Sequence, residues 1–252
     1  MSGLRSYSPK LDPSTPTILL SSEESHHLIA VHRAQAGDEV SVIDGRGSEW
    51  RARIETADKR GTKLEGTQYI EHSPPKTRIA LAQSIPKAKG MESIIRKATE
   101  LGVQDVFPIL SARTELKVRG GRKLDKWQIV AIEAAKQSGN PFIPTIHPET
   151  PLEQFLESGT SEFGICLIAS LQMDSRPLYS RLAGMEFTKN PSGLLLIGPE
   201  GDFSNSEYSE ISDARFLSIT LGEHVLKCET AAIKAISLLN TNFPGWLARL
   251  NG

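Results

Sequence analysis

Apolar residues in the first seventy positions recur mainly at every second position, which is the period of a β-strand. The clearest example is residues 39–54, where two alternating runs flank a turn rich in Asp and Gly. This pattern predicts a β-hairpin. Residues 18–20 and 63–70 are weaker strand candidates, and residues 21–33 predict a short helix capped by Ser22. A segment this small and strand-rich closes its edges most simply as a barrel, so we expect a small β-barrel over residues 1–73.

Beyond residue 75 the pattern changes to short apolar runs that alternate with amphipathic helices. The tandem proline Pro74-Pro75 marks a linker before this change. Strands are expected at residues 79–82, 103–109, 164–169, 193–197 and 216–221, and helices at 90–101, 124–138, after Ser204 and at 230–239. Ser204 and Glu207 form a capping-box pattern, and Gly102 is placed to end the first helix. We therefore expect an α/β domain over residues 76–252, with a mostly parallel sheet and helices on both faces.

The composition narrows the class of protein. The chain has 252 residues, of which 38% are hydrophobic and 23% are charged, so a wholly disordered or fibrous chain is excluded. No apolar run approaches the ~18–20 residues that cross a bilayer, and the first residues lack the apolar core of a signal peptide. Cys166 and Cys228 are far apart and form no CxxC pair, which argues against a disulfide scaffold and a structural zinc site. We expect a cytoplasmic protein that holds no metal.

Charge is distributed unevenly along the chain. The formal net charge is −1, yet residues 76–126 contain twelve basic and five acidic residues, a local charge of +7. A basic segment inside a neutral protein is typical of a phosphate-binding face. The alternative is that these lysines and arginines lie on solvent-exposed helix surfaces and bind no ligand.

Two loops near the C-terminus are the best candidates for chemistry. The chain has no phosphate-binding P-loop, no GxGxxG, no HExxH and no GxSxG, and the pair His26-His27 has no partner at metal-ligand spacing. The loops lie in residues 194–207, which contain GPEGD, and residues 218–232, which contain LGEHVLKCETAA. Each follows an apolar strand and precedes a helix, and ligands of open α/β sheets bind at the carboxyl ends of strands. Alternatively, both are ordinary turns that need glycine for its conformational freedom.

On these residues the chain resembles a known family. The matching stretches are KATELGV (97–103), EAAKQSG (133–139), IGPEGDF (197–203) and LGEHVLKCETAA (221–232). Residues 27–40, which include Arg33, match the N-terminal domain of the family. They resemble the bacterial 16S ribosomal RNA uridine N3-methyltransferases, which are SPOUT or α/β-knot methyltransferases with an N-terminal PUA-like barrel. The resemblance covers nearly the whole chain, and the two C-terminal loops are its most specific part.

The resemblance implies a fold and a cofactor that periodicity alone does not give. It implies a deep trefoil knot in the C-terminal domain, a site for S-adenosyl-L-methionine made by that knot, and a homodimer that forms through the knot region. The cofactor-binding positions carried over by motif are Ile197, Gly198, Gly201, Leu221, Gly222, Leu226 and Ala231. The implied substrate is 16S rRNA of the small ribosomal subunit, with Arg33, Lys97, Lys117, Arg119 and Arg122 as RNA-binding candidates.

Three residues depart from the family pattern. Asp202 stands where a second glycine usually follows GPEG, and Lys227 and Cys228 stand where arginine and threonine usually precede ETA. Asp202 adds a negative charge beside a cationic cofactor. Lys227 keeps the positive charge of arginine but loses its paired hydrogen-bond geometry. Cys228 is interpreted as a small, partly buried residue rather than a nucleophile, because methylation of a nitrogen needs none.

Methyl transfer to uracil N3 requires that the N3 proton leaves, so a general base or a cation that stabilises the uracil anion is expected. The catalytic candidates are Glu200, Glu229, Lys227 and Arg113, and His224 is the only imidazole in the two loops. Both glutamates have structural alternatives: Glu229 could stabilise the start of the last helix, and Glu200 could fix its own loop through backbone amides. The base therefore stays unassigned from the sequence.

Three other functions are compatible with parts of the sequence. A non-catalytic RNA-binding protein would be expected to lose the two C-terminal loops, but both are present. A knotted methyltransferase of another RNA, such as tRNA, is disfavoured by the KATELGV stretch and the PUA-like front part. An unrelated α/β hydrolase or dehydrogenase is disfavoured by the missing motifs.

Overall fold

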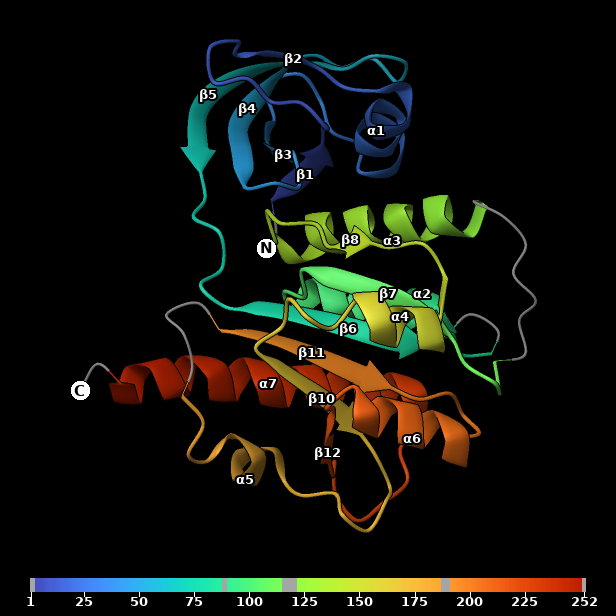
Figure 1. Ribbon diagram of the computed structural model, residues 1–252. Coiled ribbons are helices and arrows are strands. Elements are labelled where there is room, and N and C mark those ends of the chain that lie inside the picture. Colours follow the sequence, from blue (N-terminus) through green and yellow to red (C-terminus); the bar gives the residue numbers. More distant parts are fainter. Residues whose placement is uncertain (1–2, 88–89, 115–121, 187–190, 251–252) are drawn as a thin grey trace. The chain divides into compact units, whose positions relative to one another are not determined.

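The computed structural model describes residues 3–87, 90–114, 122–186 and 191–250, with side chains described except at 122 and 244–250. The chain forms two compact units (Figure 1). The first comprises Met1–Pro74 together with Ile132–Ile143, and the second comprises Pro75–Ala131 and Pro144–Gly252. The chain thus returns to the first unit after the linker, in the second half of helix α3 (Arg122–Ser138) and the turn that follows it.

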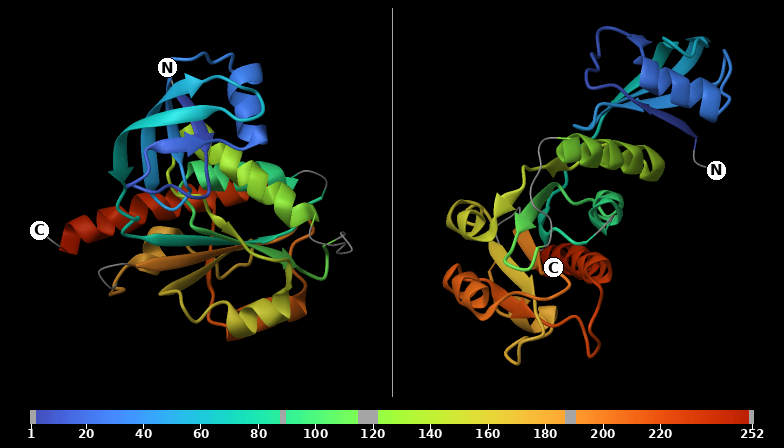
Figure 2. Two further views of the ribbon diagram at one scale, coloured as in Figure 1. Left: turned by 90° about the horizontal axis from the view of Figure 1, so that it is seen from above. Right: turned by 90° about the vertical axis from the view of Figure 1, so that its right-hand side faces the viewer.

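The first unit is built on a five-stranded curled sheet (Figure 2). Its strands are β1 (Leu4–Tyr7), β2 (Thr17–Leu19), β3 (Glu39–Ile43), β4 (Ser48–Thr56) and β5 (Lys63–Glu71), in the order β1-β3-β4-β5-β2. Strands β3 and β4 form the predicted hairpin, with Trp50, Ala52 and Ile54 buried and Arg51 and Arg53 exposed. Because β1 and β2 end the sheet and do not pair with each other in the described part of the chain, the expected barrel is an open half-barrel.

A short helix, α1 (Ser22–His26), covers the curled sheet and continues as a π-helical turn over His27–Val31. Its cap is Ser21, whose hydroxyl accepts a hydrogen bond from the Glu24 amide, so the expected cap at Ser22 was one residue late. Leu28 of the following turn packs into the apolar core of this unit beside Val42 and Leu64.

The second unit contains a parallel sheet. Its strands are β6 (Arg78–Ser84), β7 (Asp105–Leu110), β8 (Thr145–Ile146), β9 (Thr150–Pro151), β10 (Ile165–Ala169), β11 (Ser192–Ile197) and β12 (Leu217–Ile219), in the order β12-β10-β11-β6-β7-β8, with β9 also paired to β7. Every one of these pairings is parallel. The central strands β6 and β11 are buried almost throughout, as expected where both faces of a sheet are covered.

Helices cover both faces of this sheet. They are α2 (Gly90–Glu100), α4 (Leu152–Ser158), α5 (Leu178–Leu182), α6 (Asn205–Asp213) and α7 (Cys228–Leu250), besides the first half of α3. Helices α2 and α7 pack together on one face, and α4 and α6 lie on the other (Figure 2). Helix α7 runs well beyond the expected residues 230–239. The predicted parallel α/β architecture is confirmed. No described helix is both long enough and apolar enough to cross a membrane.

Candidate functional site

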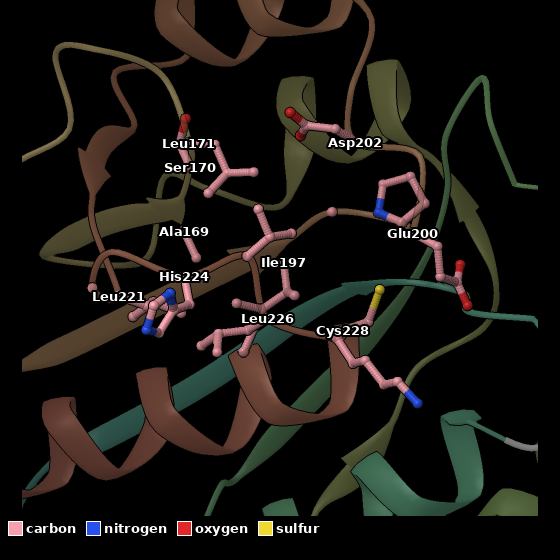
Figure 3. Close-up of a pocket in the computed structure, with 16 residues that line it drawn as sticks. Ala169, Ser170, Leu171, Ile197, Glu200, Asp202, Leu221, His224, Leu226 and Cys228 are labelled. Carbon is pink, nitrogen blue, oxygen red and sulfur yellow. The ribbon is translucent and has the colours of Figure 1, made fainter.

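A pocket of about 310 Å³ opens at the carboxyl ends of β10, β11 and β12 (Figure 3). Its lining comes from three segments that follow these strands, namely Ala169, Ser170 and Leu171, then Ile197, Gly198, Pro199, Glu200 and Asp202, then Leu221, Gly222, His224, Val225, Leu226, Lys227, Cys228 and Ala231. The two loops singled out in the sequence therefore meet in one cavity. This is the edge where open α/β sheets bind ligands.

The structure brings six of the seven predicted cofactor residues into this lining: Ile197, Gly198, Leu221, Gly222, Leu226 and Ala231. Gly201 is the exception. Its carbonyl oxygen accepts a hydrogen bond from the Arg113 guanidinium, and a Cβ at this glycine would lie 3.2 Å from Cδ of Arg113. Gly201 thus supports the loop from outside the pocket.

Two glycines in the lining have a physical reason to lack a side chain. A Cβ at Gly198 would lie 3.1 Å from the ring of Phe203, which packs behind the loop. Gly222 has φ +121°, a conformation that other residues rarely adopt. Both loops therefore present backbone rather than side chains to the cavity at these points.

The GPEGD loop is fixed by the start of helix α6. Ser204 and Glu207 form the predicted capping box, with each side chain bonded to the other's backbone amide. The other oxygen of Glu207, which is buried, accepts a hydrogen bond at 2.7 Å from the Ala112 amide. Since Arg113 binds the Gly201 carbonyl, the segment after β7 is attached to the loop at two points.

The remaining catalytic candidates gather at the start of α7. Glu200 is exposed and accepts a hydrogen bond at 2.9 Å from the Lys87 amide, and Lys227 is exposed in the pocket lining. Glu229 is half-buried and does not line the pocket; its Oε1 atom lies 3.0 Å from where a Cβ of Gly90 would stand. Arg113 also lies outside the lining.

Cys228 is buried among these groups. Burial raises the pKa of its thiol to about 11, and the negative charges of Glu200 and Glu229 act in the same direction. The thiol is therefore protonated at neutral pH, which is the opposite of what a nucleophilic cysteine needs.

The RNA-binding candidates are dispersed. Arg33 is exposed in the first unit, and Lys97 on α2 pairs with Glu100 at 2.9 Å. Lys117 and Arg119 lie outside the described residues, and Arg122 is described only as the first residue of α3. Elsewhere in the basic segment, Lys126 pairs with Glu92, Lys123 with Glu149 and Arg78 with Asp105. Glu92, Glu100 and Asp105 are already counted in the +7 charge, so of these pairs only the one with Glu149, outside the segment, balances part of it.

Two polar residues in or beside the pocket were not predicted from the sequence. Ser170 follows β10 and lines the cavity, and Tyr208 on α6 bonds to both Ser170 and Asp202. Only the position of Ser170 at the end of an apolar strand could have signalled it. Among the described residues, no group of three or more His, Cys, Asp or Glu could hold a metal ion.

Comparison with known proteins decides the family. Residues 73–240 match the RNA methyltransferase domain, and residues 20–65 match the PUA domain of RNA methyltransferases. The chain belongs to this RNA methyltransferase family. The predicted family is thereby confirmed at this level, while the uridine N3 specificity goes beyond it.

Named relatives from other organisms align with most of this chain. The ribosomal RNA small subunit methyltransferase E of Synechocystis is 32% identical over 89% of this chain and 73% of its own length. The protein of the same name from Aquifex aeolicus is 30% identical over 88% of this chain and 93% of its own length.

Solved structures of family members match the fold. A Legionella pneumophila protein in complex with its bound cofactor SAM has a TM-score of 0.87 at 29% identity and covers 96% of this chain and 98% of its own. The Neisseria gonorrhoeae ribosomal RNA small subunit methyltransferase E, bound to S-adenosyl methionine, has a TM-score of 0.83 at 27% identity and covers 95% and 97%. The predicted fold class, a PUA-like unit followed by a SPOUT-type α/β domain, is confirmed, and the knot stays a prediction.

Proposed function

We propose that this protein methylates N3 of a uridine in the 16S ribosomal RNA of the small subunit, with S-adenosyl-L-methionine as the methyl donor. The observation that supports this most directly is the pocket, because both family loops line it at the carboxyl ends of three parallel strands. Relatives that match over about nine tenths of both chains carry the name ribosomal RNA small subunit methyltransferase E. The choice of uridine N3 rests on the resemblance of the loop motifs.

The residues of the pocket fit this donor. Adenine is a flat ring with polar edges, and the lining offers it aliphatic walls, such as Leu221 and Leu226, together with loop backbone. Gly198 and Gly222 allow a ligand to approach that backbone closely. The carboxylates of Glu200 and Asp202 suit a ligand that carries a positive charge.

When bound, the donor supplies a methyl group on a positively charged sulfur. The chain's task is then to align the uracil N3 atom with that methyl group and to remove the N3 proton. Glu200 is the better placed proton acceptor, since it lines the pocket and is exposed, whereas Glu229 lies in the first turn of α7 outside the lining. Lys227 stabilises the negative charge that develops on the uracil oxygens. Arg113 holds the loop in place through Gly201.

The RNA partner is bound, in this proposal, by the basic segment of residues 76–126 and by the PUA-like unit with Arg33. The homodimer through a knot region and the cytoplasmic location, like the knot itself, follow from the resemblance and the composition. Each is open to direct measurement, the dimer by light scattering of the purified protein.

The cofactor site can be tested with one matched pair of glycines. Gly222 and Gly184 both have positive φ values, +121° and +78°, but only Gly222 lines the pocket. Alanine at either position strains the backbone by about 1–2 kcal/mol. We expect only Gly222→Ala to weaken S-adenosylmethionine binding, by about tenfold or more in calorimetry, because the strain shifts loop backbone that lines the pocket. Equal affinities in the two variants would remove this loop from the site.

The activity is tested by mass mapping of ribosomal RNA from cells with and without the gene. The expected result is one uridine of the small subunit RNA that loses 14 mass units when the gene is absent, with the methyl group located on N3 by fragmentation. A lost methyl group on tRNA would favour the rival substrate. Unchanged RNA in both fractions would favour the non-catalytic alternative.

A further inference from the structure

One wall of the pocket is polar, and the hydrogen bonds behind it have no role in the proposed mechanism. Ser170 and Asp202 line it from the ends of β10 and β11, on the opposite side from Leu226 and Cys228 (Figure 3). Tyr208 of α6 joins them. The Ser170 hydroxyl donates to Oη of Tyr208 at 3.3 Å, and Oη of Tyr208 donates to Oδ1 of Asp202 at 2.8 Å. This wall is therefore a chain of hydrogen bonds that ends on a carboxylate.

These hydrogen bonds hold the Asp202 carboxylate through only one of its two oxygens. Burial raises the pKa of Tyr208 to about 12, so its phenol stays protonated and serves as a donor at neutral pH. The Phe203 amide donates to the same Oδ1 atom at 2.8 Å. The other oxygen, Oδ2, has no hydrogen-bond partner among the described residues. Asp202 thus holds a fixed negative charge at the pocket with one oxygen available.

The backbone of Asp202 is left-handed, with φ +63°. Aspartate tolerates this region better than most residues other than glycine, because its side chain can accept a local hydrogen bond. Here Oδ1 accepts that bond from the Phe203 amide. The local backbone therefore helps to hold the carboxylate in one place at the edge of the pocket.

We propose that the Asp202 carboxylate makes the pocket prefer the charged cofactor over its spent product. This inference rests on the proposed function. S-adenosylmethionine and S-adenosylhomocysteine share the adenosyl and amino-acid groups and differ by one methyl group and one positive charge on sulfur. A fixed negative charge interacts with the amino-acid charges of both ligands, but only the sulfonium of the donor adds a further Coulomb attraction. Asp202 therefore favours loading of the donor and release of the product after methyl transfer.

Calorimetry with both ligands tests this. Asp202→Asn removes the charge, keeps the shape and retains a residue that tolerates left-handed backbone. We expect the ratio of the two dissociation constants, product over donor, to fall by about fivefold or more, mainly through weaker donor binding. Asp202→Gly should lower the ratio in the same way, and thermal unfolding measures the separate cost of losing the hydrogen bonds from Tyr208 and Phe203. Glu210→Gln on exposed α6 is the matched control, because it removes one negative charge outside the pocket and should keep the wild-type ratio.

The outcomes separate this inference from the function beneath it. A wild-type ratio in both Asp202 variants would overturn the inference and leave the cofactor assignment intact. Equal weakening of both ligands would also overturn it, since the carboxylate would then hold a group that the two ligands share. A wild-type protein that binds neither ligand would contradict the proposed function itself.

Discussion

At the scale of single residues, Lys227 brings a positive charge to a pocket lining that otherwise carries the acids Glu200 and Asp202. Lys227→Met keeps the aliphatic stem and removes the charge. We expect it to lower the methylation rate by about 10²-fold or more, the scale of a lost electrostatic stabiliser in a transition state. The measurement is single-turnover transfer of labelled methyl to small-subunit RNA.

Lys227→Arg is the matched control for this prediction. It keeps the charge and adds the paired hydrogen-bond geometry of arginine, so the rate should be unchanged or higher. Cofactor and RNA affinities are measured alongside. A parent rate in Lys227→Met with unchanged affinities would exclude Lys227 from catalysis.

The two cysteines provide an internal comparison for the pocket. Burial raises the pKa of both thiols to about 11, but only Cys228 lines the cavity. Because the thiolate is the reactive form, alkylation of both by iodoacetamide should be slow at pH 7 and rise steeply towards pH 11. At pH 10, S-adenosylmethionine should slow the labelling of Cys228 and leave that of Cys166 unchanged, as followed by peptide mass spectrometry. Rapid labelling of Cys228 at pH 7 would contradict this assignment.

At this scale the sequence predicts which residues near the end of a strand line the pocket. It does not predict contacts between segments that are far apart in the chain. Of the six cofactor candidates in the lining, Ile197, Gly198, Leu221 and Gly222 lie at or just after strand ends, while Leu226 and Ala231 lie before and within the helix that follows. The link from Tyr208 to Ser170 joins residues 38 positions apart, so no local pattern contains it. The support that Arg113 gives to Gly201 is hidden for the same reason.

At the scale of elements, the C-terminal half of α3 carries a buried ion pair. Lys136 donates to Glu24 of α1 at 2.7 Å, with side chains only 5% and 10% exposed, and also lies 2.7 Å from Glu133. Glu24 further accepts hydrogen bonds from the Ser6 hydroxyl and the Tyr7 amide. This network lies within the first unit and links the EAAKQSG stretch to α1 and β1.

Lys136→Met should therefore destabilise the protein by about 3–5 kcal/mol, because it leaves Glu24 buried with an uncompensated charge. Lys63→Met is the matched control. Its partner is Glu55 at 2.9 Å, in the same unit, but both side chains are more than 40% exposed, and the expected change is below about 1 kcal/mol. Denaturant unfolding measures both. Equal effects of the two substitutions would show that burial of the Lys136 pair does not matter.

At the scale of the whole molecule, the spacing of apolar residues predicted the type of each sheet but not the order of its strands. The buried runs of β6, β10 and β11 indicate parallel strands, and the structure has them. That β11 lies between β10 and β6 depends on which apolar surfaces pack best, and a sequence pattern carries no such pairwise information. The return of residues 132–143 to the first unit is a tertiary feature of the same kind.

The basic segment makes a prediction for the molecule as an RNA-binding protein. Each phosphate neutralised on binding releases counterions, so the logarithm of affinity should fall linearly with the logarithm of salt concentration, by about 0.7–0.9 per phosphate contact. Lys97 and Lys126 are paired with acids, and the prediction that Lys117, Arg119 and Arg122 contact the RNA rests on the sequence. Reversing these three to Glu should weaken RNA binding and flatten the salt slope, with cofactor affinity unchanged.

A charge-preserving set is the control for this last experiment: Lys117→Arg, Arg119→Lys and Arg122→Lys together change the shape of the three side chains but not their charge. Filter binding of small-subunit RNA at several salt concentrations should give this set the parent slope, because counterion release depends on charge rather than on side-chain geometry. If the Glu set also keeps the parent slope, the basic segment is a solvated surface and the RNA contacts lie elsewhere, with the PUA-like unit and its exposed Arg33 as the next region to test.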